Sequence, residues 1–146
     1  MANTTCITNT FRNEILTTGF NLTSKSFKAA LYFASATVNA TTAAYTTTGE
    51  ATGTGYTAGG AAVTNGTAVT GANSTVTGDT YYWTPSANIA WTTVTIAAFD
   101  SVMIYDANTP FHPVGIWNFG TQTVTAGNIT LTMPANAAGT ALVRLL

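Results

Sequence analysis

One uninterrupted stretch, residues 88–106 (NIAWTTVTIAAFDSVMIYD), most constrains the fold of this chain. It is rich in β-branched and aromatic residues and contains neither glycine nor proline, a composition typical of strands. Apolar residues alternate with polar ones up to Trp91 and resume on the opposite parity at Val94, which predicts a β-bulge near residues 92–93. Over residues 99–105 both parities carry large apolar side chains, as in a strand covered on both faces. We therefore predict two strands at the centre of a sheet.

Shorter strands separated by turn residues account for most of the remaining chain. Residues 26–33 place four apolar side chains on one side of a strand and Lys28 and Tyr32 on the other. Asn65 and Gly66 form a dipeptide that is a strong hairpin-turn signal. We predict further strands at residues 26–33, 61–64, 67–70, 74–77, 80–84, 114–119, 121–126, 128–133 and 141–146.

A single helix is predicted, over residues 8–18. Asn9 or Thr10 can cap its first turn, and Phe11 and Ile15 lie on one face at i and i+4. A glycine directly after the helix can end it. A long loop follows the next strand: residues 48–60 contain five glycines around Tyr56, and we expect an ordered loop that buries this one aromatic side chain as an anchor.

These elements predict an all-β protein. About eight to ten short strands with turn signals every eight to twelve residues are typical of an antiparallel β-sandwich or barrel. We favour a jelly-roll sandwich, and an immunoglobulin-like sandwich remains open. The predicted organisation is an N-terminal arm with a short helix over residues 1–25, followed by a single β-sandwich domain over residues 26–146, since 146 residues are enough to bury a core.

Low charge is the unusual property of the composition. Charged residues make up 6% of the chain, whereas soluble domains average about 25%. Two interpretations compete: a hydroxyl-rich β exterior, or a surface that is largely buried against protein neighbours, because interface centres are depleted in charge. We favour the second. The four Lys and Arg residues are too few and too scattered for nucleic-acid binding.

No apolar run approaches the roughly 20 residues that span a bilayer, and the first residues lack a secretory pattern. We therefore expect synthesis in a cytoplasm and no membrane partner. Cys6 is the single cysteine, so an internal disulfide cannot form.

Catalytic and cofactor motifs lack the context that their chemistry requires. Residues 53–58 match a dinucleotide-binding glycine pattern, but no helix follows to hold a pyrophosphate. A hydrolase would have to use His112, the only histidine, and no nucleophile elbow surrounds Ser101. Asp100 and Asp106 lie about 20 Å apart along an extended strand, too far for a glycosidase pair or one metal site. We expect no enzyme activity, no cofactor and no metal.

Four segments together carry a resemblance to known proteins: MANTTCITNTFRNEILTTGFN, LYFASATVNATTAAYTTTGE, ATGTGYTAGG and QTVTAGNITLTMP. The chain resembles small virion structural proteins of tailed bacteriophages, and within them it is most similar to capsid decoration, or cement, proteins. The resemblance implies a non-enzymatic, often jelly-roll β-sandwich. It also implies a homo-oligomer, dimer or trimer, that binds the major capsid protein on the outer surface of the virion.

We expect this protein to contact the particle through two segments, each of which carries single large side chains in an otherwise flexible stretch. These are the N-terminal arm, residues 1–16, and the glycine-rich loop, and we expect deletion of residues 1–10 to abolish particle binding with the β fold intact. The candidate interface residues are Phe11, Ile15, Glu50, Tyr56, Tyr82, Phe111 and His112.

A tail- or head-fibre-associated protein or adhesin is the alternative function. It would bind a host-surface glycan through the aromatic side chains of Phe111 and of Tyr81 and Tyr82.

Overall fold

The computed structural model describes residues 2–66, 81–137 and 139–145. The described residues form mainly antiparallel strands and one short helix, so the all-β prediction is confirmed. The predicted strands at 67–70 and 74–77 lie outside the described residues. The elements are β1 (Cys6–Ile7), α1 (Asn9–Thr17), β2 (Phe27–Phe33), β3 (Ala61–Val63), β4 (Tyr81–Trp83), β5 (Ile89–Asp106), β6 (Pro113–Leu131) and β7 (Val143–Leu145).

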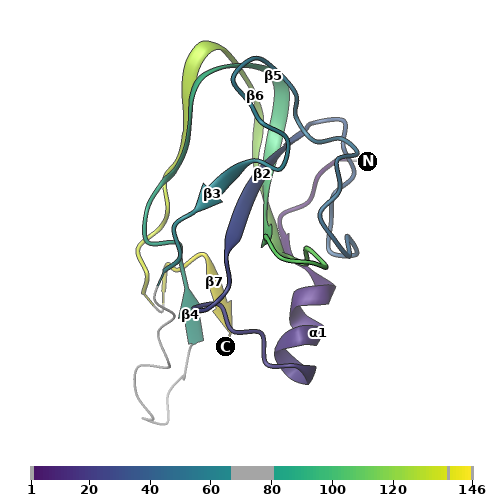
Figure 1. Ribbon diagram of the computed structural model, residues 1–146, viewed down its shortest axis with the longest axis vertical. Helices are drawn as coiled ribbons and strands as arrows, with labels where there is room; N and C mark the ends of the chain where they lie inside the picture. Colours follow the sequence, from purple (N-terminus) through teal and green to yellow (C-terminus); the bar gives the residue numbers. More distant parts are fainter. Residues whose placement is uncertain (1, 67–80, 138, 146) are drawn as a thin grey trace.

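A five-stranded sheet has the order β1-β6-β5-β2-β3, and β4 pairs with β7 in a separate two-stranded sheet. Every strand pair is antiparallel. Figure 1 shows β5 and β6 as one long ribbon that arches over the top of the molecule, with α1, β4 and β7 at the lower end.

The prediction of two strands in residues 88–106 is wrong, because β5 is one strand of 18 residues. The expected bulge is confirmed: pairing with β6 shifts register between Trp91 and Val94, and Thr93 has φ 53°. A second irregularity follows at Ala98, where φ is 52°. Bulges bend a strand without ending it, so the parity change marks a bend in the strand.

β6 differs from its prediction for the same reason. Three short strands were expected between residues 114 and 133, and one strand of 19 residues runs through them. The expected breaks coincide with Gly120 and Ala126, where φ is 82° and 47°. These irregularities allow the ribbon to arch, so that Val102 lines the same hollow as Leu131 and Met133 from the other half of the ribbon.

Both faces of the five-stranded sheet are buried over residues 99–105, as predicted. One face belongs to the main core, which joins both halves of the ribbon to Phe27, Leu31 and Trp83. The opposite face forms a smaller core around Tyr32 and Met103. Residues of the loop that follows β2, among them Val38 and Tyr45, pack on it. Double coverage explains why both parities of β5 are apolar there.

The N-terminal residues are integrated into this architecture. β1 pairs with β6, and Asn3 is buried, with its Nδ2 donating to Asp100 Oδ1 at 2.5 Å. The helix is confirmed, but its cap is Thr8, not Asn9 or Thr10. The Thr8 hydroxyl accepts from the Phe11 backbone N–H and also donates to a β6 carbonyl. We therefore expect deletion of residues 1–10 to disturb the sheet as well as the arm.

The loop over residues 48–60 is ordered and packs against two strands. Thr54 bridges to Thr95 of β5, and the Tyr56 hydroxyl accepts from the Leu31 backbone N–H at 2.9 Å. A Cβ at Gly53 would lie 1.9 Å from the Thr95 carbonyl oxygen. The loop therefore needs glycine here for its close approach to β5, and the prediction of an anchoring Tyr56 is confirmed.

Candidate interaction surface

The seven candidate residues fall into three places. Four of them, Phe11, Ile15, Phe111 and His112, lie on α1 and the loop over residues 107–112. Glu50 and Tyr56 contact each other in a second place, the glycine-rich loop. Tyr82 lies alone in β4, opposite Arg144 of β7.

Of the four residues on α1 and the 107–112 loop, one is fully buried and three are at least partly exposed. Phe11 is buried, and its ring packs edge-on against Phe20 at 5.1 Å between centroids. Ile15 is half-buried on the same face of the helix. Phe111 is 39% exposed and has φ 60° after a cis peptide bond between Thr109 and Pro110. Phe11 is thus committed to the core, and Phe111 is the accessible aromatic of the group.

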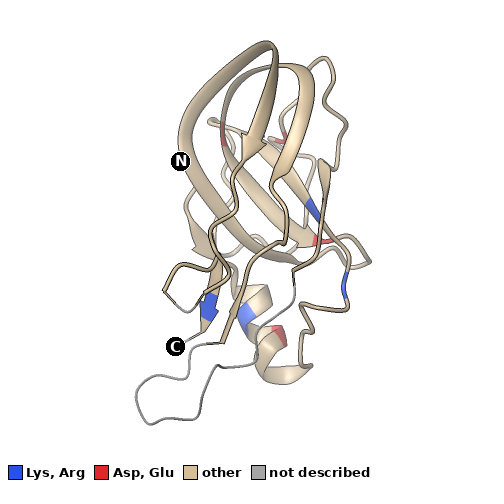
Figure 2. Ribbon diagram, turned by 90° about the vertical axis from the view of Figure 1, so that its left-hand side faces the viewer, with Lys and Arg blue, Asp and Glu red and all other residues tan. Residues whose placement is uncertain are grey.

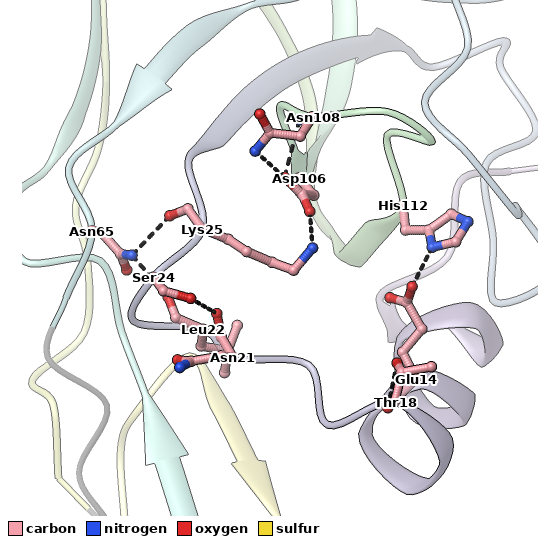
Figure 3. Close-up of polar contacts among 10 residues, drawn as sticks. All are labelled: Glu14, Thr18, Asn21, Leu22, Ser24, Lys25, Asn65, Asp106, Asn108 and His112. Carbon is pink, nitrogen blue, oxygen red and sulfur yellow. Dashed lines mark hydrogen bonds and ion pairs between the residues drawn. The ribbon is translucent and has the colours of Figure 1, made fainter.

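A polar side-chain contact joins the helix to this loop. His112 Nδ1 lies 2.5 Å from Glu14 Oε1, and Figure 3 shows the two side chains pointing toward each other. The sequence analysis lists His112 as a candidate interface residue, and the structure places it against a residue 98 positions away in the chain. The imidazole therefore helps to dock α1.

Glu50 forms the centre of a buried polar cluster, which we call the Glu50 cluster. Its carboxylate is 4% exposed and accepts hydrogen bonds from the hydroxyls of Tyr45 (2.5 Å) and Tyr56 (2.9 Å) and from the Gly59 backbone N–H (2.7 Å). Tyr105 stacks on Tyr45 at 4.5 Å between ring centroids and donates to the Gly59 carbonyl. Three donors satisfy the buried carboxylate, as a buried charge requires.

The tyrosines of the Glu50 cluster stay protonated. Burial and the neighbouring Glu50 raise the pKa of Tyr105 to about 12. The pKa values of Tyr45 and Tyr56 are raised further, first by burial and then by Glu50. None of these phenols is an activated base or nucleophile near neutral pH. The hydrogen bonds from Tyr56 and Gly59 to Glu50 hold the loop against the rest of the fold.

A second polar connection fastens the segment that leads into β2. Lys25 Nζ contacts Asp106 Oδ2, and Asn108 donates to Asp106 Oδ1 (Figure 3). Burial raises the pKa of Asp106, but the hydrogen bonds from Lys25 and Asn108 outweigh it and the pKa lies below its usual value. Asn65 donates to the Lys25 carbonyl, so this region is held from three segments of the chain.

Charge is distributed unevenly between the inside and the surface. Glu50, Asp100 and Asp106 are buried. Within the described residues, the charged side chains that are exposed are basic: Arg12, Lys28 and Arg144. In Figure 2 the arch of β5 and β6 carries no charged residue along its upper part.

Among the large exposed apolar side chains, the sequence analysis named Tyr81 and Phe111 but missed Leu16, Phe119 and Leu145. Leu16 on α1 is 86% exposed, and Phe119 on β6 is 36% exposed. Tyr81 is 53% exposed, and its cross-strand neighbour Leu145 is also exposed. A helical wheel could have found Leu16, because it lies away from the Phe11 and Ile15 face.

No three His, Cys, Asp or Glu side chains within the described residues could hold a metal ion together. A cavity of about 590 Å³ is lined by residues 84–88, by residues 133–136 and by Gly66, none of which is acidic, basic, histidine or cysteine. No helix in the described ranges has the length and apolar character needed to cross a membrane.

Comparison with known proteins finds no matching family model, no matching curated protein and no matching solved structure.

Proposed function

We propose that this chain is a bacteriophage capsid decoration protein that binds the assembled shell at contacts between major capsid subunits and stabilises it without catalysis. The observation that carries the proposal is the nearly neutral surface: three charged side chains are exposed among the described residues. Charge depletion is typical of the centres of protein interfaces. A component that binds only the assembled shell adds its binding free energy to shell stability.

A jelly-roll sandwich on the outer surface of the virion is part of the same proposal. Support comes from the two halves of the β5 and β6 ribbon, which line one hollow between them. The chain would be made in the cytoplasm of the bacterial host and would act as a dimer or trimer.

Co-sedimentation with expanded shells that lack the protein tests this function. We expect saturable binding at a copy number that matches the shell symmetry. Leu16→Ser should weaken binding, because it removes the most exposed apolar side chain of α1. Asn13→Ser, at an exposed position of the same helix, is the matched control. Absence of wild-type binding to shells would refute the proposal.

An adhesin is the second candidate, and the exposure of Tyr81 beside Tyr82 favours it. Exposed aromatic rings stack on sugars in many binding sites, and β4 places both residues next to β7. Binding to a glycan array that is lost in Tyr82→Ala and Tyr81→Ala would support this function. No glycan signal, together with shell binding, would eliminate it.

A further inference from the structure

Among the residues that the structure describes, none pairs with the outer edge of β6 over residues 119–131. β1 pairs only with Ile116 and Gly115 of β6, and the glycine-rich loop covers the other side of the ribbon through Thr54 and Thr95. Within the described ranges, no backbone hydrogen bond joins this outer edge to another segment. An unpaired edge is a template for another strand.

Backbone geometry fixes which groups point outward. Successive N–H groups of an antiparallel strand point alternately toward its partner and away from it, so one part of the backbone groups of β6 faces β5 and the other part faces outward. Regular pairing with β5 runs without a register shift from Ile129 to Leu131, and this is the segment best shaped to accept a new strand.

An apolar groove runs beside this edge. Two adjoining hollows of about 350 and 250 Å³ share Phe119, Thr130 and Leu131. Trp117 and Val124 extend the lining on either side. A strand beside a groove is the arrangement by which β-augmentation combines backbone hydrogen bonds with pockets for alternate side chains.

Neither the edge nor the groove contains a charged residue. Natural edges are usually protected by lysine, proline or bulges, and here the irregularities near Gly120 and Ala126 leave residues 129–131 in regular pairing. Antiparallel pairing of this segment with its own copy across a twofold axis would bring no like charges together. An uncharged strand therefore fits this edge best, and the chain itself supplies one.

We propose that two copies of this chain pair through residues 129–131 of β6, related by a twofold axis that places Thr130 opposite Thr130 of the other copy, so that the five-stranded sheet continues from one copy into the other. Phe119 and Leu131 of each copy are then covered by the partner. This inference deepens the homo-oligomer part of the proposed function and rests on it. It can be tested without shells, so that its failure and the failure of shell binding are separable.

Sedimentation velocity of the full chain over a range of concentrations is the test. We expect a dimer for the wild type and a shift toward monomer in Thr130→Lys, with the dissociation constant raised at least about tenfold, because the two lysines meet at the edge. Ala90→Lys is the matched control. Ala90 is the cross-strand neighbour of Thr130 and is also exposed, but it lies one strand further in, and its dimer should persist.

A cross-linking measurement keeps the inference testable if Thr130→Lys fails to fold. With Cys6 replaced by alanine, oxidised Thr130→Cys should form a covalent dimer, because the twofold axis places residue 130 opposite residue 130 of the other copy, whereas Ala90→Cys should not. A wild-type monomer at all concentrations, or equal behaviour of the lysine variants at 130 and 90, would overturn the pairing. A monomer whose shell binding is lost in Thr130→Lys would assign the edge to the shell protein and would likewise overturn it.

Discussion

Removal of one hydroxyl, in Tyr56→Phe, tests whether the Glu50 cluster holds the glycine-rich loop. The hydroxyl accepts from the Leu31 N–H at 2.9 Å and donates to Glu50 Oε1 at 2.9 Å. Phenylalanine keeps the ring that packs on Trp91 at 6.4 Å between centroids. The substitution therefore removes two hydrogen bonds with little change in packing.

The expected cost follows from what each lost bond leaves behind. The Leu31 N–H lies in a buried strand, and an unsatisfied buried donor costs about 1–3 kcal/mol. A hydrogen bond to a carboxylate contributes about 1.5–3 kcal/mol. Glu50 keeps its hydrogen bonds from Tyr45 and Gly59, so the loss of the bond from Tyr56 should cost less than this range suggests. We expect the free energy of unfolding to fall by about 3 kcal/mol.

Urea denaturation followed by tryptophan fluorescence measures this change. Tyr81→Phe is the control, because Tyr81 is 53% exposed and its hydroxyl makes no hydrogen bond within the described part of the chain, so stability should change by less than about 0.5 kcal/mol. In a double-mutant cycle with Glu50→Gln, the two substitutions should be non-additive, since they share one hydrogen bond. A loss below about 1 kcal/mol in Tyr56→Phe would refute the anchoring role.

Three further changes test the helix cap, the loop contact and the Lys25 ion pair. Thr8→Ala should lower stability by about 2 kcal/mol, since it removes a cap and a buried hydrogen bond; helix content by circular dichroism and urea titration would show it, and unchanged stability would contradict it. Gly60→Ala should cost at least about 2 kcal/mol, because φ is 74° and the new Cβ would lie 1.8 Å from a β2 carbonyl oxygen. Gly120→Ala, with φ 82° and open space around it, should cost less, and equal costs would exclude the clash. Lys25→Met should destabilise the fold at pH 7. Because the folded pKa of Asp106 is lowered, its contribution is present above the unfolded pKa of about 3.9 and is lost as the pH falls through the folded value. The difference from wild type should therefore shrink in acid, and a constant difference would contradict the linkage.

Local sequence patterns predicted most of the strands but not their continuity. The parity change after Trp91 located the bulge in β5 correctly, and Gly120 marked an irregularity in β6. The bulge was expected within a strand, whereas the change of pattern before Phe99 and the glycine at 120 were taken to end strands. Whether a bulge ends a strand depends on whether the partner strand continues beside it, and that pairing connects residues far apart in sequence. The sequence of one strand alone therefore does not show whether that strand continues past a bulge.

The contacts of the candidate residues were even less accessible from the sequence. Glu14 and His112 are 98 positions apart, and Asp100 meets Asn3 across 97. No spacing rule connects such pairs, because the fold itself brings them together. Tyr56 was recognised as an anchor because it is the one aromatic residue among the glycines. Its contact with Glu50 could not be recognised, because the Glu50 carboxylate becomes buried beside it only when the chain folds.

The placement of charge leads to a last prediction about association. The chain has a net charge of −1, yet Glu50, Asp100 and Asp106 lie inside, so the described surface is more neutral than the composition and slightly basic. Screening by salt weakens contacts between exposed charges and leaves neutral contacts largely intact. Shell binding and self-pairing should therefore change little between low and physiological ionic strength, as measured by co-sedimentation and by sedimentation velocity. A steep loss of either with added salt would show that the few exposed basic side chains, and not the neutral arch, carry the association.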